Sequence, residues 1–218
     1  MANSSSSKSN IICLLGPTAS GKTKMVVDLV SRYPFEIINV DSAQIYRGMD
    51  IGTAKPDQAI LEAAPHRLLD IKDPSEVYSA ADFRLDAIKE INSIISSGKT
   101  PLLVGGTMLY FKVLRDGLAY MPHADSEIRA EITEIAINQG WSQVHQRLAM
   151  VDPESAARIH PNDTQRLQRA LEVYLISGKN LSAFHSEEQI VKKETNHISP
   201  FNLHFFGIQP YDRAILHK

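Results

Sequence analysis

The stretch Gly16-Pro17-Thr18-Ala19-Ser20-Gly21-Lys22-Thr23 matches the phosphate-binding pattern G-x-x-x-x-G-K-[ST] at each of its fixed positions. It lies between an apolar run at residues 11–15 and a second one at residues 25–30, so we predict a loop between a strand and a helix. In such a loop the glycines let successive backbone N–H groups point at phosphate oxygens. The stretch therefore predicts that the chain binds a phosphate or a diphosphate.

Two side chains of this loop have chemical roles of their own. Lys22 would place a positive charge beside the outer phosphate, and the hydroxyl of Thr23 can ligate Mg²⁺. The helix that begins near Lys22 directs its positive end at the same anion. The alternative is an ordinary glycine turn without a ligand, which the strand–loop–helix context disfavours. We predict that the diphosphate is bound by Gly16, Pro17, Thr18, Ala19, Ser20, Gly21, Lys22 and Thr23, and the metal by Thr23.

The composition is that of an ordinary globular protein. The 218 residues are 43% hydrophobic and 22% charged, which suits one large domain or a domain with an appended module. A net charge of -2 excludes a uniformly basic nucleic-acid-binding protein, so any such contact needs a local basic patch. The single cysteine, Cys13, excludes an internal disulfide and is expected in the core of a cytoplasmic protein. Residues 1–10 are Ser-rich without an apolar run, so we expect a disordered tail rather than a secretory signal or a membrane segment.

Strand and helix patterns alternate through the first half of the chain. Apolar runs at residues 35–40 and 101–104 indicate buried strands, and a capping box at Ser79 begins a helix between them. This order predicts an α/β fold of the P-loop type, a doubly wound parallel sheet whose ligands bind at the carboxyl ends of the strands. Asp41 and Thr107 follow two of these strands, so we expect both near the phosphate loop.

From about residue 121 the strand patterns give way to helical ones. We predict helices at residues 126–139, 143–151 and 164–177, followed by a polar loop at residues 182–200. An apolar run at residues 203–208 then predicts a return to the sheet, which brings Arg213 toward the strand ends. The predicted organisation is a P-loop core of residues 11–120 and 201–218 with a helical insertion domain at residues 121–200.

The role of Asp41 has two interpretations from local pattern alone. A carboxylate at the end of a hydrophobic strand is typical of the Mg²⁺-organising Asp of a kinase or nucleotidase. The alternative is a general base that takes a proton from a nucleophile. Local pattern does not choose between them.

Five longer strings carry a resemblance to a known family. They are DSAQIYRGMDIGTAKP at 41–56, PHRLLD at 65–70, YSAADF at 78–83, LLVGGTMLY at 102–110 and IHPNDTQRLQRALEV at 159–173. With them, the chain resembles the bacterial tRNA dimethylallyltransferases from Ile11 to its end. The resemblance implies transfer of the dimethylallyl group from dimethylallyl diphosphate to the exocyclic N6 amine of the adenosine adjacent to the tRNA anticodon, with release of diphosphate.

The resemblance also implies a role for each catalytic residue. Asp41 would act as the general base, and Lys22 and Arg213 would stabilise the leaving diphosphate. Thr107 would lie beside the reacting centre; a helix N-cap is an alternative and compatible role for its hydroxyl. The adenine would leave its stack to enter the pocket, where the segment from Asp41 to Gln44 reads it. The implied catalytic residues are Asp41, Thr107, Lys22 and Arg213.

The helical insertion would contact the anticodon arm of the tRNA. An alternative from local pattern is that Arg166 and Arg169 form a solvated helix face paired to Asp163 and Glu172. Trp141 is expected to pack within the helices rather than stack on a base. Five histidines lack the spacing of a zinc site, so each is expected to be structural or exposed: His66, His123, His145, His160 and His185. The implied tRNA-binding residues are Asp41, Ser42, Ala43, Gln44, Thr107, Arg129, Gln165, Arg166, Leu167, Gln168 and Arg169.

The implied cofactor is Mg²⁺ and the implied partners are tRNA and dimethylallyl diphosphate, with no membrane and no stable protein partner. The family continues beyond Lys218 with further helices, so we expect a nearly complete diphosphate site here, whereas tRNA binding and activity depend on those helices. Two other classes stay open. A small-metabolite P-loop kinase would share the loop and Asp41 but bind ATP, and a binding module without chemistry would need a γ-phosphate switch loop, which no pattern marks.

Overall fold

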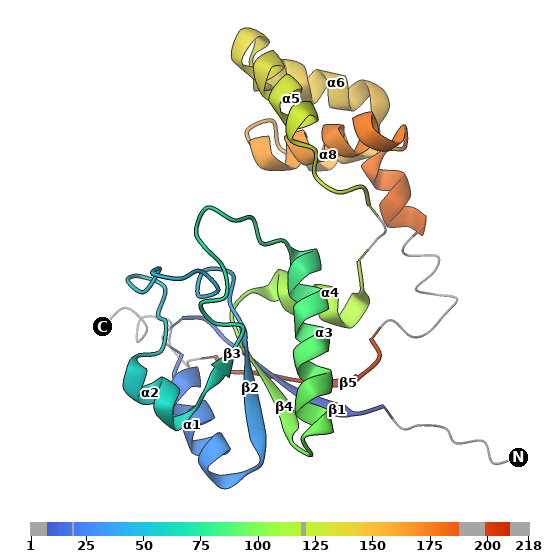
Figure 1. The fold of residues 1–218 in the computed structure, drawn as a ribbon. Coiled ribbons are helices and arrows are strands. Elements are labelled where there is room, and N and C mark those ends of the chain that lie inside the picture. Colours follow the sequence, from blue (N-terminus) through green and yellow to red (C-terminus); the bar gives the residue numbers. More distant parts are fainter. Residues whose placement is uncertain (1–7, 19, 119–120, 188–198, 210–218) are drawn as a thin grey trace, which may run out of the picture. The chain divides into compact units, whose positions relative to one another are not determined.

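The computed structural model describes residues 8–18, 20–118, 121–187 and 199–209 (Figure 1). The chain divides into two compact units, one formed by residues 1–117 with 198–218 and the other by residues 118–197. These divisions lie close to the boundaries predicted from the sequence at residues 120 and 200. Within the described residues, no helix is long and apolar enough to cross a membrane.

The first unit is built on a five-stranded sheet in which every pair of neighbouring strands is parallel, in the order β3-β2-β4-β1-β5. The α/β fold predicted from the sequence is confirmed. The pairing of β2 with β4 runs from Phe35 opposite Thr100 to Val40 opposite Gly105, so both strands end at the same edge. The strands are β1 (Asn10–Leu15), β2 (Phe35–Val40), β3 (His66–Arg67), β4 (Thr100–Gly105) and β5 (Asn202–Gly207).

Helices cover both faces of this sheet (Figure 1). One core joins the sheet to α3 and α4 and includes Cys13, which is fully buried as predicted; burial raises the pKa of its thiol to about 12. The other core contains Val26 of α1 and Ala64, the residue that follows α2. The helices are α1 (Lys22–Arg32), α2 (Gln58–Ala63), α3 (Ala80–Ser96) and α4 (Met108–Asp116).

Helix α3 begins at the capping box that the sequence predicts. The Ser79 side chain accepts a hydrogen bond from the Asp82 amide, and the Asp82 carboxylate accepts one from the Ser79 amide. The apolar stripe behind it is buried, and the Phe83 ring stacks on Tyr110 of α4 with 4.2 Å between ring centroids. Capping and burial therefore agree on where α3 begins and which side it buries.

Strand β1 begins inside the tail predicted at residues 1–10. The Asn202 amide donates a hydrogen bond to the Ser9 carbonyl at 2.9 Å, and Lys8 Nζ donates one to the Ser199 carbonyl at 2.8 Å. Pairing with β5 thus orders Lys8 to Asn10, a long-range effect that composition does not reveal. Residues 1–7 lie outside the described part of the chain.

The second unit is helical: α5 (Ser126–Gln139), α6 (Trp141–Val151), α7 (Pro153–Arg158) and α8 (Thr164–Ser177). Helices α5 and α8 have the predicted bounds, whereas α6 begins at Trp141 rather than at Gln143. The side chain of Trp141 packs against the core of this unit, as expected from the sequence. That core includes Ile132, Ala136, Val144, Leu148, Leu167 and Leu171.

A buried carboxylate explains two features of this unit that the sequence analysis missed. Asp152 caps α7, an unpredicted helix, by accepting a hydrogen bond from the Ser155 amide at 3.0 Å. Its other oxygen accepts one from the Ser182 amide at 3.0 Å, where residues 181–187 are helical although a loop was predicted from residue 182. These contacts hold the pKa of Asp152 below its usual value despite burial, which acts the other way. One charged side chain thus organises two chain segments far apart in sequence.

We predict that Gly105→Ala destabilises the first unit. A methyl group at Gly105 would lie 2.0 Å from the Val40 carbonyl oxygen, so the paired strand ends would have to separate. Such overpacking costs about 1–3 kcal/mol, measured as a loss of unfolding free energy in urea. Gly207→Ala is the matched control, because a methyl group there meets nothing within 4 Å. Equal stability of the two variants would contradict this account.

Candidate active site

The phosphate loop closes on itself around Lys22. Its Nζ donates hydrogen bonds to the carbonyl oxygens of Gly16 at 2.7 Å and Pro17 at 2.6 Å. Burial lowers the pKa of Lys22, and the charge of Asp41 opposes that shift. Gly21 precedes α1 with a φ of 85°, a conformation that favours glycine. Ala19 lies outside the described residues.

The first glycine of the loop is required by a close approach of two backbones. A methyl group at Gly16 would lie 2.7 Å from the carbonyl oxygen of Ile208, just beyond β5. The Ile208 amide also donates a hydrogen bond to the carbonyl of Leu15 at 2.7 Å. The end of β5 thus lies directly against the start of the loop.

A cavity of about 300 Å³ lies at the carboxyl ends of the strands in the first unit. It brings together Lys22 and Thr23 of the loop with Asp41 and Gln44. The other predicted loop residues that line it are Thr18, Ser20 and Gly21. The lining residues that sequence reasoning did not single out as site residues are Asn39, Thr53, Ala54, Pro56, His66, Val104, Gly105 and Gly106. A basic residue, Lys22, and an acidic one, Asp41, therefore share one cavity.

Asp41 directly follows β2 and uses one carboxylate oxygen locally. Its Oδ1 accepts hydrogen bonds from the amides of Ala43 at 2.9 Å and Gln44 at 3.3 Å, which forms an Asx turn. The turn fixes the orientation of the carboxylate. The second carboxylate oxygen of Asp41, Oδ2, takes no part in this turn.

Thr107 is the N-cap residue of α4, but its hydroxyl does not cap the helix. Thr107 Oγ1 accepts a hydrogen bond from the Ser42 amide at 3.0 Å, and it contacts Ser42 Oγ at 3.3 Å. The Thr107 amide donates to the Val40 carbonyl at 3.2 Å. Thr107 therefore ties the segment after β4 to the segment after β2, beside Asp41.

Gln44 holds the wall of the cavity in place. Its Nε2 donates hydrogen bonds to the carbonyls of Thr53 at 2.9 Å and Ala54 at 3.1 Å. Lys55 then fixes the same loop, since its Nζ contacts the Asp50 carboxylate at 2.6 Å and the Asp70 carboxylate at 2.5 Å. With both Nε2 hydrogens engaged, the remaining polar atom of Gln44 is the acceptor Oε1.

His66 also lines the cavity, and the sequence analysis did not place it there. Its Nδ1 lies 2.7 Å from the Ala64 carbonyl, so Nδ1 carries a proton and the neutral ring offers Nε2 as an acceptor. Burial lowers the pKa of His66, which favours that neutral form. Its place on β3 beside Ile37 could have been found only from the strand pairing.

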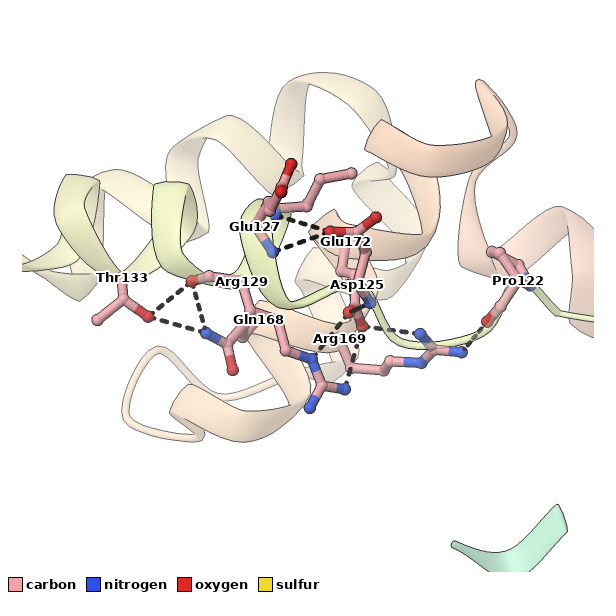
Figure 2. Close-up of polar contacts among 9 residues, drawn as sticks. Pro122, Asp125, Glu127, Arg129, Thr133, Gln168, Arg169 and Glu172 are labelled. Atoms are coloured by element: carbon pink, nitrogen blue, oxygen red, sulfur yellow. Dashed lines mark hydrogen bonds and ion pairs between the residues drawn. The ribbon is translucent and has the colours of Figure 1, made fainter. Parts of the chain in front are cut away.

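The predicted tRNA-binding residues of the second unit differ in what they contact (Figure 2). The side chain of Leu167 is fully buried in the core, so it is not available to a ligand. Gln168 Nε2 donates hydrogen bonds to the Arg129 carbonyl and to Thr133 Oγ1. The pairing considered from the pattern is present, Arg169 with Glu172 at 2.7 Å and Arg166 with Asp163 at 3.3 Å. Gln165 is exposed, and Arg213 lies outside the described residues.

The oxygen atoms in the cavity suit Mg²⁺ better than a transition metal. In the described part of the chain, no three His, Cys, Asp or Glu side chains gather as metal ligands. Thr23 and Asp41 line the same cavity, and a hydroxyl and a carboxylate are oxygen ligands of the kind that fit Mg²⁺.

Residues 44–218 match the family model described as IPP transferase. A full-length tRNA isopentenylpyrophosphate transferase from Bacillus halodurans is 39% identical, with a TM-score of 0.55 over 92% of this chain and 60% of that one. A tRNA delta(2)-isopentenylpyrophosphate transferase from Staphylococcus epidermidis is 34% identical, with a TM-score of 0.53 over 92% of this chain and 63% of that one. A eukaryotic dimethylallyltransferase acting on tRNA is 28% identical, with a TM-score of 0.72 over 92% of this chain and 48% of that one.

This chain thus spans about half to three fifths of the length of these three structures. None of the three is described as a kinase, so they give no support to that alternative.

We predict that Thr107→Val lowers the unfolding free energy by about 1 kcal/mol, the typical net value of one hydrogen bond, because the Ser42 amide loses its acceptor. Thr107→Ser keeps the hydroxyl and should stay close to the unchanged protein. Urea unfolding of both variants measures the difference. If the Thr107→Val and Thr107→Ser variants are equally stable, the Thr107 hydroxyl does not join the segments that follow β2 and β4.

Proposed function

The chain belongs to the IPP transferase family, and on that premise we propose that it carries the catalytic centre of a tRNA dimethylallyltransferase. Such an enzyme transfers the dimethylallyl group of dimethylallyl diphosphate to the N6 amine of the adenosine adjacent to the tRNA anticodon and releases diphosphate. The observation that carries the proposal is that Lys22, Thr23 and Asp41 line one cavity. An anion site and a carboxylate are the two groups that this displacement needs.

We propose that the loop from Gly16 to Thr23 binds the diphosphate. The supporting features are the glycine-rich backbone before α1 and the ammonium of Lys22 within the loop. Lys22 would exchange its contacts with the Gly16 and Pro17 carbonyls for contacts with phosphate oxygens. As the C–O bond to the leaving group breaks, these donors stabilise the charge that grows on the diphosphate.

Asp41 is proposed as the general base. The exocyclic amine of adenine is a weak nucleophile because its lone pair is delocalised into the ring. As the new N–C bond forms, the amine proton passes to Oδ2 of Asp41, the oxygen that the Asx turn leaves unused. Thr107, at the start of α4, holds the same segment by accepting a hydrogen bond from the Ser42 amide.

Mg²⁺ is proposed as the cofactor, which the Thr23 hydroxyl and the diphosphate oxygens would hold. If Asp41 is a metal ligand instead of the general base, its carboxylate would be a further ligand. When bound, it would neutralise part of the charge of the leaving diphosphate. Arg213 is proposed to contribute a further positive charge, as the family resemblance implies.

The tRNA partner is proposed from the family and from the eukaryotic structure described as acting on tRNA. In the first unit, Asp41, Ser42, Ala43, Gln44 and Thr107 would contact the adenosine. In the second, Arg129, Gln165, Arg166 and Arg169 would face the anticodon arm. A cytoplasmic location is proposed as well, since a single cysteine suits a reducing compartment.

Replacement of Lys22 by Ala tests the diphosphate site. Charge-assisted contacts with phosphate contribute about 1.5–3 kcal/mol, so affinity for dimethylallyl diphosphate should fall about tenfold or more. Isothermal titration calorimetry measures this, with ATP as the competing ligand class. The control is Lys24→Ala, two residues along α1, which should leave affinity unchanged. Unchanged binding by Lys22→Ala would remove the phosphate assignment, and tighter binding of ATP than of the prenyl diphosphate would favour a kinase.

Asp41→Asn separates the base from a metal ligand. Asn keeps an Oδ1 that can accept from the Ala43 and Gln44 amides, so the Asx turn should persist while the basic oxygen is lost. A general base contributes about 10²- to 10⁴-fold, so single-turnover prenyl transfer should fall by that factor with both substrates still bound. The assay needs protein that spans the full length of the relatives. Recovery of the rate on raising Mg²⁺ would instead make Asp41 a metal ligand.

A further inference from the structure

The Glu172 carboxylate of α8 is the centre of a polar cluster in the second unit (Figure 2). It receives hydrogen bonds from Arg129 Nε at 2.8 Å, Arg129 Nη2 at 3.2 Å and Arg169 Nη1 at 2.7 Å. The Asp125 amide donates a fourth bond at 2.8 Å. The side chain of Glu172 is 0% exposed, so these contacts replace its water entirely.

The cluster places its negative charge inside and its positive charges outside. The side chains of Arg129 and Arg169 are 41% and 32% exposed, whereas that of Glu172 is 0% exposed. The two guanidinium groups and the Glu172 carboxylate together carry one net positive charge, and the Asp125 carboxylate is engaged as the N-cap of α5. The arginine contacts and the Asp125 amide lower the pKa of Glu172 although burial opposes this, so the carboxylate stays ionised.

Both arginines are held at more than one point. Arg169 Nη2 also donates to the Pro122 carbonyl at 2.7 Å. The Arg129 guanidinium is held through Nε and Nη2 on the two carboxylate oxygens of Glu172, and its backbone carbonyl accepts from Thr133 Oγ1 at 2.7 Å and from Gln168 Nε2 at 3.1 Å. Within the described residues, Nη1 of Arg129 and Nε of Arg169 form no hydrogen bond with the protein, so donors of both side chains remain for a ligand.

We propose that Glu172 is a positioning residue for RNA binding, which holds Arg129 and Arg169 side by side as a preformed guanidinium pair for backbone phosphate of the anticodon arm. This inference rests on the proposed function, which supplies RNA as the ligand. A guanidinium suits phosphate because its planar N–H groups match two phosphate oxygens. Holding long side chains in place beforehand removes part of the entropy cost of binding.

Arg166 provides an internal comparison on the same helix. Its side chain is 78% exposed, and its partner is the partly exposed Asp163 at 3.3 Å. Such exposed pairs contribute little and leave the arginine mobile. One turn of α8 thus carries an arginine paired with a buried carboxylate, Arg169, and one paired with a partly exposed carboxylate, Arg166.

Glu172→Gln tests the inference because positioning and net charge predict opposite results. Removal of a negative charge strengthens the long-range attraction to RNA, so a purely electrostatic patch would bind equally or more tightly. Positioning predicts weaker binding, by about tenfold, because an amide cannot accept from all four donors. Asp163→Asn is the matched control: it removes a carboxylate beside Arg166, and Asn still serves as an N-cap, so affinity should stay equal or rise.

The measurement is fluorescence anisotropy of a labelled anticodon stem-loop RNA over a range of salt concentrations, with urea unfolding of every variant. Arg129→Lys is the second variant, since it keeps the charge and the other contacts of Glu172 but loses the two-point contact. It should bind more weakly, with urea unfolding reporting the stability lost with the second contact to the buried carboxylate, and it decides the question if Glu172→Gln does not fold. Wild-type affinity in Glu172→Gln, or in Arg129→Lys, would overturn the positioning role. The binding assays use protein that spans the full length of the relatives, and if that protein without substitutions does not bind RNA, the proposed function itself is contradicted and this role with it.

Discussion

The parallel pairing of β2 with β4 is the constraint on which the candidate site depends. Because Val40 lies opposite Gly105, the segments that follow the two strands leave the sheet at the same edge. Asp41 follows one strand and Thr107 the other, and the Ser42 amide joins them through the Thr107 hydroxyl. The pairing favours glycine at position 105, because a methyl group there would lie 2.0 Å from the Val40 carbonyl oxygen. A backbone contact between two strands therefore places the carboxylate of the site.

Sequence patterns were sufficient where the deciding interactions are local. The capping box of α3 and the bounds of α5 and α8 follow from contacts within one helical turn, and the structure confirms them. They were insufficient where distant segments decide. Helix α7 and residues 181–187 depend on Asp152, and the place of His66 in the cavity depends on the pairing of the short β3. Neither dependence leaves a periodic signal in the sequence.

The arginines of the second unit show why two interpretations of one pattern can both hold. Local spacing allowed Arg169 to be a ligand contact or the partner of Glu172, and the structure shows the pairing. The third member, Arg129, lies on another helix 43 positions away, so spacing along α8 does not reveal it. The buried Glu172 carboxylate pairs with only some of the guanidinium N–H groups of Arg129 and Arg169, so the outer N–H groups stay unused by this carboxylate. The structural ion pair therefore leaves N–H groups of the same side chains available for the proposed contact with RNA.

The contacts of Lys22 with the Gly16 and Pro17 carbonyls have a consequence for turnover. The ammonium has protein acceptors of its own, so a phosphate that enters the loop competes with them rather than meeting an unsatisfied charge. The same acceptors receive Lys22 again when diphosphate departs. The affinity of the loop for the proposed anion would thus be a difference between two sets of contacts to the Lys22 ammonium.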